Sequence, residues 1–188
     1  IDGVCSVTIL LKGLKKAGAD ADVDYTVPDR IADGYGINEN IINHAIEDGI
    51  DTIVTCDNGI AAIPQINYAK DNNMTVIVTD HHDIPFKEEN GEKVFLESDA
   101  DAIVNPKQKE CKYPFKMLCG ATVAYKLIEI IYERLNLNPE DLNEYRQLAA
   151  IATIGDVVDL EDENRVLVKF GLSTLKNTKN TGIRALVD

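Results

Sequence analysis

Met74-Thr75-Val76-Ile77-Val78-Thr79-Asp80-His81-His82 is the stretch of this sequence that decides its fold. Residues 74–79 form an apolar run rich in β-branched side chains, which predicts a strand buried in a parallel sheet. Ligands of open α/β sheets bind at the carboxyl ends of the strands, so we expect Asp80, His81 and His82 to face a functional crevice. Imidazole and carboxylate groups together suit a divalent transition metal such as manganese or zinc. A polar turn with two solvated histidines is the alternative explanation of so short a motif.

Three further segments carry an aspartate, and two of them, like residues 80–82, lie at predicted strand-to-helix junctions. A second predicted strand, residues 51–56, ends in Asp57-Asn58-Gly59 just before a helix. The chain opens with Ile1-Asp2-Gly3, again before a helix, and Asp156 lies beside a glycine near the other end. Each aspartate alone is commonly a helix N-cap. Their shared placement instead predicts a multinuclear metal site. We expect Asp57 and His81 within about 10 Å of each other, because Asp and His ligands lie about 2.0–2.2 Å from a shared ion.

Predicted strands and helices alternate up to residue 104. The predicted strands are 21–27, 51–56, 74–79 and 102–104, and the predicted helices in this part are 3–17, 38–48 and 61–72. Residues 87–99 form a polar surface excursion, and three helices follow at 120–135, 139–153 and 164–176. This order predicts an α/β fold with a parallel sheet, helices on both of its faces, right-handed crossovers and a helical C-terminal part. At 188 residues the chain fits a single domain, 1–188.

Composition restricts the partners and the compartment. The net charge is −13, from 19 basic and 32 acidic residues, which weighs against nucleic-acid binding by this chain alone. A basic cluster that follows the strand 102–104 is the main exception: Lys107, Lys109, Lys112 and Lys116. No stretch approaches the roughly 18 apolar residues of a membrane span. The four cysteines form no C-x-x-C pair, which favours reduced thiols and a cytoplasmic protein.

Several segments together resemble the DHH phosphoesterase superfamily and, within it, the RecJ family of single-strand-specific exonucleases. Asp80-His81-His82 marks the superfamily, whereas the P-D-R, G-Y-G, N-P-K and Y-P-F segments point to RecJ. The segments are Val27-Pro28-Asp29-Arg30, Gly34-Tyr35-Gly36, Asp57-Asn58-Gly59, Asp80-His81-His82, Val104-Asn105-Pro106-Lys107, Tyr113-Pro114-Phe115, Gly120-Ala121 with Ala124-Tyr125-Lys126-Leu127, and Gly155-Asp156-Val157-Val158 with Glu163-Asn164-Arg165. Asn58 stands where a cysteine is usual, and Asp159 where a proline is common.

The resemblance implies a 5′→3′ exonuclease that hydrolyses single-stranded DNA in recombination and repair. Two manganese or magnesium ions would neutralise charge and activate water. By similarity, Asp57 bridges the two ions, and the other metal ligands are Asp2, His81 and Asp156. His82 is expected to contact the scissile phosphate or the nucleophile. Asp80 is expected to orient a ligand histidine, with a helix N-cap as the alternative.

Arg30 could bind substrate phosphate through its planar guanidinium fork, with a structural salt bridge as the alternative. His44, on the predicted helix 38–48, is expected to be a surface or packing residue. Two other functions stay open. One is a small DHH phosphodiesterase acting on oligoribonucleotides or cyclic dinucleotides, or an inorganic pyrophosphatase. The other is a non-catalytic DHH scaffold.

The first motif of the resemblance is an aspartate-rich D-Y-D-x-D-G, of which Ile1-Asp2-Gly3 matches the last three positions. We therefore expect this chain to be part of a longer protein whose first strand lies upstream of Ile1. Domains that bind most of the DNA are expected elsewhere in that protein. On this interpretation the 188-residue chain alone binds one manganese at best and is nearly inactive as a nuclease.

Overall fold

The computed structural model describes residues 1–18, 23–28 and 34–187 of the chain. The chain divides into two compact units: one is Ile1–Tyr25 with Pro114–Asp188, and the other is Thr26–Tyr113. The first is called the helical unit and the second the sheet unit. A single domain over residues 1–188 stays a prediction.

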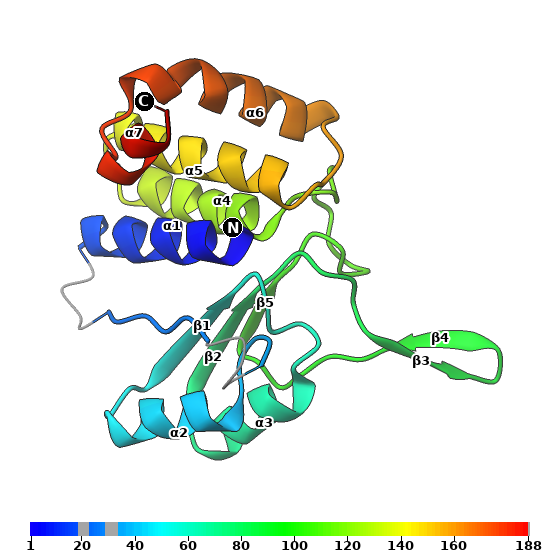
Figure 1. Ribbon diagram of the computed structural model, residues 1–188. Helices are drawn as coiled ribbons and strands as arrows, with labels where there is room; N and C mark the ends of the chain where they lie inside the picture. Colours follow the sequence, from blue (N-terminus) through cyan, green and yellow to red (C-terminus); the bar gives the residue numbers. More distant parts are fainter. Residues whose placement is uncertain (19–22, 29–33, 188) are drawn as a thin grey trace. The chain divides into compact units, whose positions relative to one another are not determined.

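A three-stranded parallel sheet forms the centre of the sheet unit (Figure 1). Its strands, in the spatial order β1-β2-β5, are β1 (Thr52–Cys56), β2 (Thr75–Thr79) and β5 (Ala102–Val104). Cys56 pairs with Thr79, and Thr79 pairs with Val104, so the three strands end level with one another. The residues that follow each strand therefore lie at the same edge of the sheet. This confirms the predicted parallel sheet.

Two helices of the sheet unit, α2 (Glu39–Glu47) and α3 (Ile63–Asp71), pack on this sheet. The core between them is aliphatic: Ile42 and Ile66 of the helices pack with Val76 and Val78 of β2, and none of the four is exposed. Helix α2 begins where the sequence predicts it. The side chain of its N-cap residue, Asn38, accepts a hydrogen bond from the backbone N–H of Ile41 at 2.9 Å.

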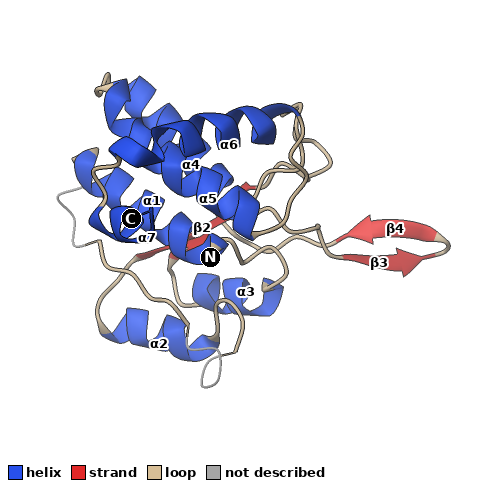
Figure 2. Ribbon diagram, turned by 45° about the horizontal axis from the view of Figure 1, so that its top comes forward, coloured by secondary structure: helices blue, strands red, loops and turns tan. Residues whose placement is uncertain are grey.

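A β-hairpin interrupts the sheet unit between β2 and β5. Strands β3 (Phe86–Glu89) and β4 (Glu92–Phe95) pair antiparallel and extend as an arm whose eight residues are all exposed (Figures 1 and 2). The two turn residues, Asn90 and Gly91, both have positive φ, 54° and 82°. This is the geometry of a type I′ turn, for which Asn-Gly is the preferred dipeptide. The predicted surface location is confirmed, but the two strands were not predicted.

The helical unit consists of packed helices: α1 (Asp2–Lys16), α4 (Gly120–Arg134), η1 (Pro139–Asp141), α5 (Leu142–Gly155), α6 (Asp162–Thr174), η2 (Leu175–Asn177) and α7 (Thr181–Val187). Helix α4 contacts both α1 and α5, and α5 also contacts α6. Two buried tyrosines join α4 and α5. The hydroxyls of Tyr132 and Tyr145 lie 3.2 Å apart, and their rings meet edge to face.

The predicted α/β class, with a parallel sheet and a helical C-terminal part, is confirmed. The predicted strand 21–27 is wrong over its described residues, because residues 23–27 adopt neither strand nor helix. Residues 21 and 22 lie outside the described residues. The alternating sequence pattern of residues 21–27 indicates an extended segment with one side in solvent, and such a segment does not have to join a sheet. Helix α7 was not predicted. Among the described helices, none is long and apolar enough to cross a membrane.

Candidate metal centre

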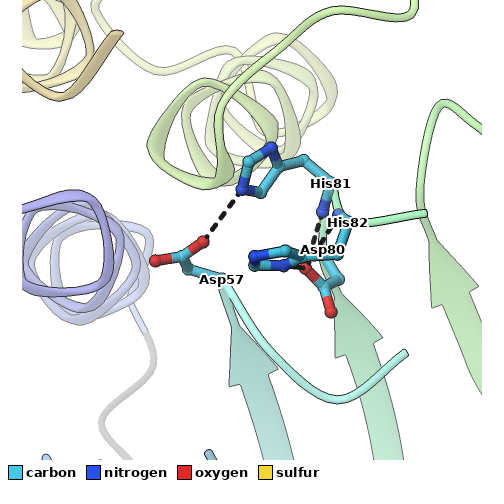
Figure 3. Close-up of side chains that lie close together, drawn as sticks. All are labelled: Asp57, Asp80, His81 and His82. Carbon is cyan, nitrogen blue, oxygen red and sulfur yellow. Dashed lines mark hydrogen bonds and ion pairs between the residues drawn. The ribbon is translucent and has the colours of Figure 1, made fainter. Parts of the chain in front are cut away.

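The candidate metal centre of the sheet unit lies at the carboxyl ends of β1 and β2 (Figure 3). Asp57 follows β1, and Asp80, His81 and His82 follow β2. The Nε2 atom of His81 lies 3.1 Å from Oδ1 of Asp57. Two residues 24 positions apart in the sequence are thus brought together by the register of two parallel strands. This confirms the expected proximity of Asp57 and His81.

The loop after β1 contains two residues with positive φ. Asp57 has a φ of 57°, in the left-handed region that, among non-glycine residues, Asp and Asn adopt most readily. Gly59 has a φ of 112°, and a Cβ added there would lie 2.5 Å from Oγ1 of Thr55. That hydroxyl in turn donates to the carbonyl oxygen of Asn58 at 2.8 Å. The tight return of the chain after Asp57 therefore requires glycine at position 59.

Asn58 braces the same loop in two directions. Its Nδ2 donates to the carbonyl oxygen of Cys56 at 2.9 Å, and its Oδ1 accepts from the N–H of Ile37 at 3.3 Å. The departure at position 58 noted in the sequence therefore has a structural role, because an amide both donates and accepts.

Asp80 is the centre of a hydrogen-bond network at the end of β2. Its Oδ1 accepts from the N–H of His81 at 2.7 Å, the N–H of His82 at 3.2 Å and Nδ1 of His82 at 2.7 Å. Its Oδ2 accepts from the N–H of Ile60 at 2.9 Å, which ties the loop after β1 to the end of β2. Burial raises the pKa of this carboxyl, but the hydrogen bonds from His82 and Ile60 outweigh burial and lower it overall.

The network decides between the two expectations for Asp80. No helix begins between Asp80 and strand β3, so Asp80 is not a helix N-cap. It contacts the ring of His82 instead of the ring of His81, which was the expected ligand. Because an ionised carboxylate only accepts hydrogen bonds, Nδ1 of His82 must carry the proton of this contact. A neutral imidazole with its proton on Nδ1 has an unprotonated Nε2. The side chain of His82 is 58% exposed.

The structure shows which of these side chains fit a metal ion. Asp57, Asp80, His81 and His82 each offer one ligand atom, and these atoms lie within 4.8 Å of one another. Both oxygens of Asp80 already accept hydrogen bonds, whereas Asp57 and His81 face each other. Two ligands about 2.1 Å from one ion and at right angles to each other are separated by about 3 Å. The 3.1 Å between His81 and Asp57 fits that arrangement.

Two other predicted ligands, Asp2 and Asp156, lie in the helical unit. Asp2 is in the first turn of α1, and its oxygens accept from the N–H groups of Gly120 and Ala121, each at 2.7 Å. These N–H groups belong to the first turn of α4, where a carboxylate is favoured. Asp156 is the C-cap residue of α5. One carboxylate oxygen of Asp2 and one of Asp156 lie within 4.8 Å of each other.

Cys119 lies just before α4 and close to Asp2. Burial and the charge of Asp2 raise the pKa of the Cys119 thiol to about 11. It stays protonated at neutral pH, and its sulfur lies 3.4 Å from Oγ1 of Thr122 and 3.5 Å from Oγ1 of Thr153. Cys119 is therefore a packed thiol, whereas a metal ligand must be a thiolate.

Two other residues were named in the sequence analysis, Arg30 and His44. Arg30 lies outside the described residues. His44 is exposed on α2, in agreement with the expected surface position. Sequence reasoning missed one residue of this edge, Asn105, whose side chain donates to the carbonyl oxygen of His82 at 2.9 Å. Its signal was its position directly after β5, level with Asp80 on the neighbouring strand.

Comparison with known proteins defines the class. The family model described as the DHH family, N-terminal domain, matches residues 1–154, so the chain belongs to the DHH family. Its relatives include single-stranded-DNA-specific exonucleases RecJ. That of Bacillus subtilis is 41% identical over 99% of this chain and 22% of the relative. That of Salmonella typhimurium is 36% identical over 100% of this chain and 32% of the relative. The chain thus spans between 22% and 32% of the length of these two relatives.

Solved structures give the same class. A crystal structure of exonuclease RecJ bound to manganese has a TM-score of 0.82 and 34% identity, covering 98% of this chain and 44% of that chain. RecJ from Thermus thermophilus, in complex with Mn²⁺, has a TM-score of 0.74 and 32% identity, and the match covers 98% of this chain and 24% of that chain. These relatives favour the exonuclease interpretation over a small DHH phosphodiesterase or a non-catalytic scaffold.

Proposed function

We propose that this chain carries the metal-dependent catalytic centre of a RecJ-like exonuclease that degrades single-stranded DNA from the 5′ end. The observation that carries the proposal is the convergence of Asp57 and His81, which come from two neighbouring strand ends and lie 3.1 Å apart. The RecJ relatives, which match nearly the whole chain, support the substrate, and the family resemblance supports the polarity. The same proposal places the protein in recombination and repair and in the cytoplasm.

We assign the metal ligands as Asp2, Asp57, His81 and Asp156, with Asp57 as the bridging carboxylate. One observation in each unit supports this set. In the sheet unit, Asp57 and His81 face each other, and in the helical unit, the carboxylates of Asp2 and Asp156 lie close together. Oxygen and imidazole donors together suit manganese, and magnesium is the alternative. When bound, the two ions would neutralise phosphate charge and activate water for in-line attack.

His82 and Asp80 are the residues that we assign to substrate and proton handling. Asp80 holds Nδ1 of His82, so the exposed ring presents Nε2 as the atom that accepts a proton or contacts a phosphate oxygen. Asp80 does not need to change protonation state for this, because hydrogen bonds keep its pKa low. Its part is to select the tautomer and to hold the ring.

The substrate is a polyanion, and the net charge of −13 makes a local cationic contact necessary. We assign a phosphate contact to Arg30, by the resemblance alone. Further domains of the same protein would then carry most of the single-strand affinity, in line with the share of the relatives that this chain spans.

The test is a digestion experiment with the full-length protein that contains this sequence. The substrate is a 5′-phosphorylated single strand labelled at its 3′ end, with a duplex and a dinucleotide as comparisons. We expect manganese-dependent release of mononucleotides from the 5′ end of the single strand, and little turnover of the other two. Preferential cleavage of the dinucleotide, or digestion from the 3′ end, would contradict the proposal.

A further inference from the structure

We propose that Asn105 is a positioning residue that holds the backbone of His82 in place for the reaction. The inference rests on the function proposed above. Asn105 directly follows β5 and is 2% exposed. Its Nδ2 donates to the carbonyl oxygen of His82 at 2.9 Å. The contact fastens the segment after β2 to the end of the neighbouring strand.

The orientation of the Asn105 amide is determined by its two partners. Nδ2 faces the carbonyl oxygen of His82, which only accepts, and Oδ1 accepts from the N–H of Lys107 at 2.8 Å. Reversing the amide would set oxygen against oxygen and N–H against N–H, so one orientation alone satisfies both contacts. The backbone carbonyl of Asn105 is itself held, because it accepts from Nε2 of Gln108 at 3.2 Å.

Hydrogen bonds consequently hold both of the peptide groups that flank the Cα of His82. Asp80 accepts from its N–H and from its ring Nδ1, and Asn105 donates to its carbonyl oxygen. The ring itself stays 58% exposed. Exposed side chains usually exchange rotamers within picoseconds to nanoseconds. An exposed ring on a fixed backbone suits a group that must meet a substrate from solvent with little reorganisation.

The chain offers an internal reference for this assignment. His44 is also exposed, on α2, and within the described part of the chain no side-chain hydrogen bond of His44 is found. Asn164 is a matched control for the asparagine. It is fully buried, and its Nδ2 donates to the carbonyl oxygens of Met117 and Asp159 at 2.6 and 2.9 Å, within the helical unit.

The first experiment measures the order of the rings of His44, His81 and His82 by ¹³C relaxation, in the metal-free full-length protein that contains this sequence, at one fixed pH. The variants are Asn105→Asp, which replaces the donor by an acceptor of the same shape, and Asn105→Ala. Asn164→Asp and Asn164→Ala are the controls. We expect a ring order parameter for His82 of about 0.8 in the wild type and below about 0.6 in both Asn105 variants, with His44 mobile throughout. The Asn164 variants should leave His82 unchanged.

The second experiment measures kcat, KM and manganese affinity in the full-length protein that contains this sequence. Both Asn105 variants should lose about 10–100-fold in kcat, the usual effect of residues that orient active-site groups. KM and manganese affinity should change by less than about threefold, since the contact touches neither substrate nor a proposed ligand. Asn164 variants should retain kcat at temperatures at which they are folded.

The outcomes separate this inference from the proposed function. An unchanged His82 ring in folded Asn105 variants, or an unchanged kcat, would overturn the inference. Global unfolding of both variants would also overturn it, because Asn105 would then serve the fold alone. A wild type that binds manganese but digests no single strand would refute the proposed function, while the ring measurement would still decide whether Asn105 positions His82.

Discussion

The ends of β1 and β2 hold their side chains in different ways. After β1, Asp57 and Gly59 have φ angles of 57° and 112°, so the loop depends on backbone conformations that few residues adopt. After β2, none of Asp80, His81 and His82 has a positive φ. Their order comes from one carboxylate, Asp80, which accepts four hydrogen bonds.

The difference predicts that glycine substitutions in the first loop affect stability alone, whereas Asp80 affects the orientation of His82 as well. A change in the loop after β1 acts on the backbone, and so on the free energy of folding. A change in Asp80 acts on the direction in which the His82 ring points, and so on catalysis, in addition to its effect on stability. Both loops are nevertheless needed at the same place, because Asp57 and His81 face each other across the strand ends. The following predictions test this division, from the largest expected effect to the smallest.

Removing a proposed metal ligand from the end of β1 or from the end of β2 should have the same effect on activity. We expect Asp57→Ala and His81→Ala each to lower manganese-dependent exonuclease activity by more than about 1,000-fold, because each removes a proposed ligand. This loss is larger than the about 10–100-fold expected for a residue that only orients a ligand. Unfolding of both variants should stay cooperative. Activity assays with calorimetric manganese titration check this, with His44→Ala as the control. Turnover of His81→Ala like that of the wild type would refute the metal centre.

Asp80→Asn should reduce kcat by about 10–100-fold, because an amide cannot accept all four hydrogen bonds that the carboxylate accepts. It should also lower the free energy of unfolding by about 1–3 kcal/mol, the cost of unsatisfied buried polar groups. The pKa of Asp80 is lowered in the folded state, so its contribution to stability is present above the pKa of the unfolded chain and is lost as the pH falls. The stability difference from wild type should therefore narrow below about pH 4, as measured by denaturant unfolding.

Gly59→Ala should destabilise the protein by about 2–4 kcal/mol, since the new Cβ both strains a positive φ and lies 2.5 Å from Oγ1 of Thr55. Gly91→Ala is the matched control in the hairpin turn. Its φ is 82° and no atom lies within 4 Å of the added Cβ, so it should cost only about 1 kcal/mol. Chemical denaturation of the two variants measures the difference. Equal losses would mean that the close approach to Thr55 has no energetic weight.

Val157→Gly should stabilise the protein by about 1 kcal/mol. Val157 follows Asp156 with a φ of 60°, which is strongly disfavoured for a β-branched residue, and it is 87% exposed, so little packing is lost. The substitution isolates backbone strain beside a proposed ligand without removing the ligand. Thermal unfolding detects the gain, and Val166→Gly, exposed within α6, should instead destabilise. A loss of stability in Val157→Gly would show that this strain is negligible.

Much of the sheet unit could be predicted because its signals are local. The apolar runs 51–56 and 74–79 define two strands, and parallel strands of similar length bring the residues after them to one edge. This is why Asp57 and His81 could be predicted as neighbours from the sequence alone. The hairpin had a local signal too, Asn90-Gly91, but charged flanking strands weakened the alternation that normally accompanies it.

Sequence alone therefore determined the fold class, the strand ends that carry the acidic and histidine side chains, and the resemblance to the DHH family. Only the tertiary structure showed that Asp80 holds His82 and not the ring of His81, and that Asn105 fixes the His82 carbonyl. The physical reason is range. Strand and helix patterns are set by neighbouring residues, whereas Asn105 reaches His82 across 23 positions through a hydrogen bond that depends on the side-by-side packing of β2 and β5.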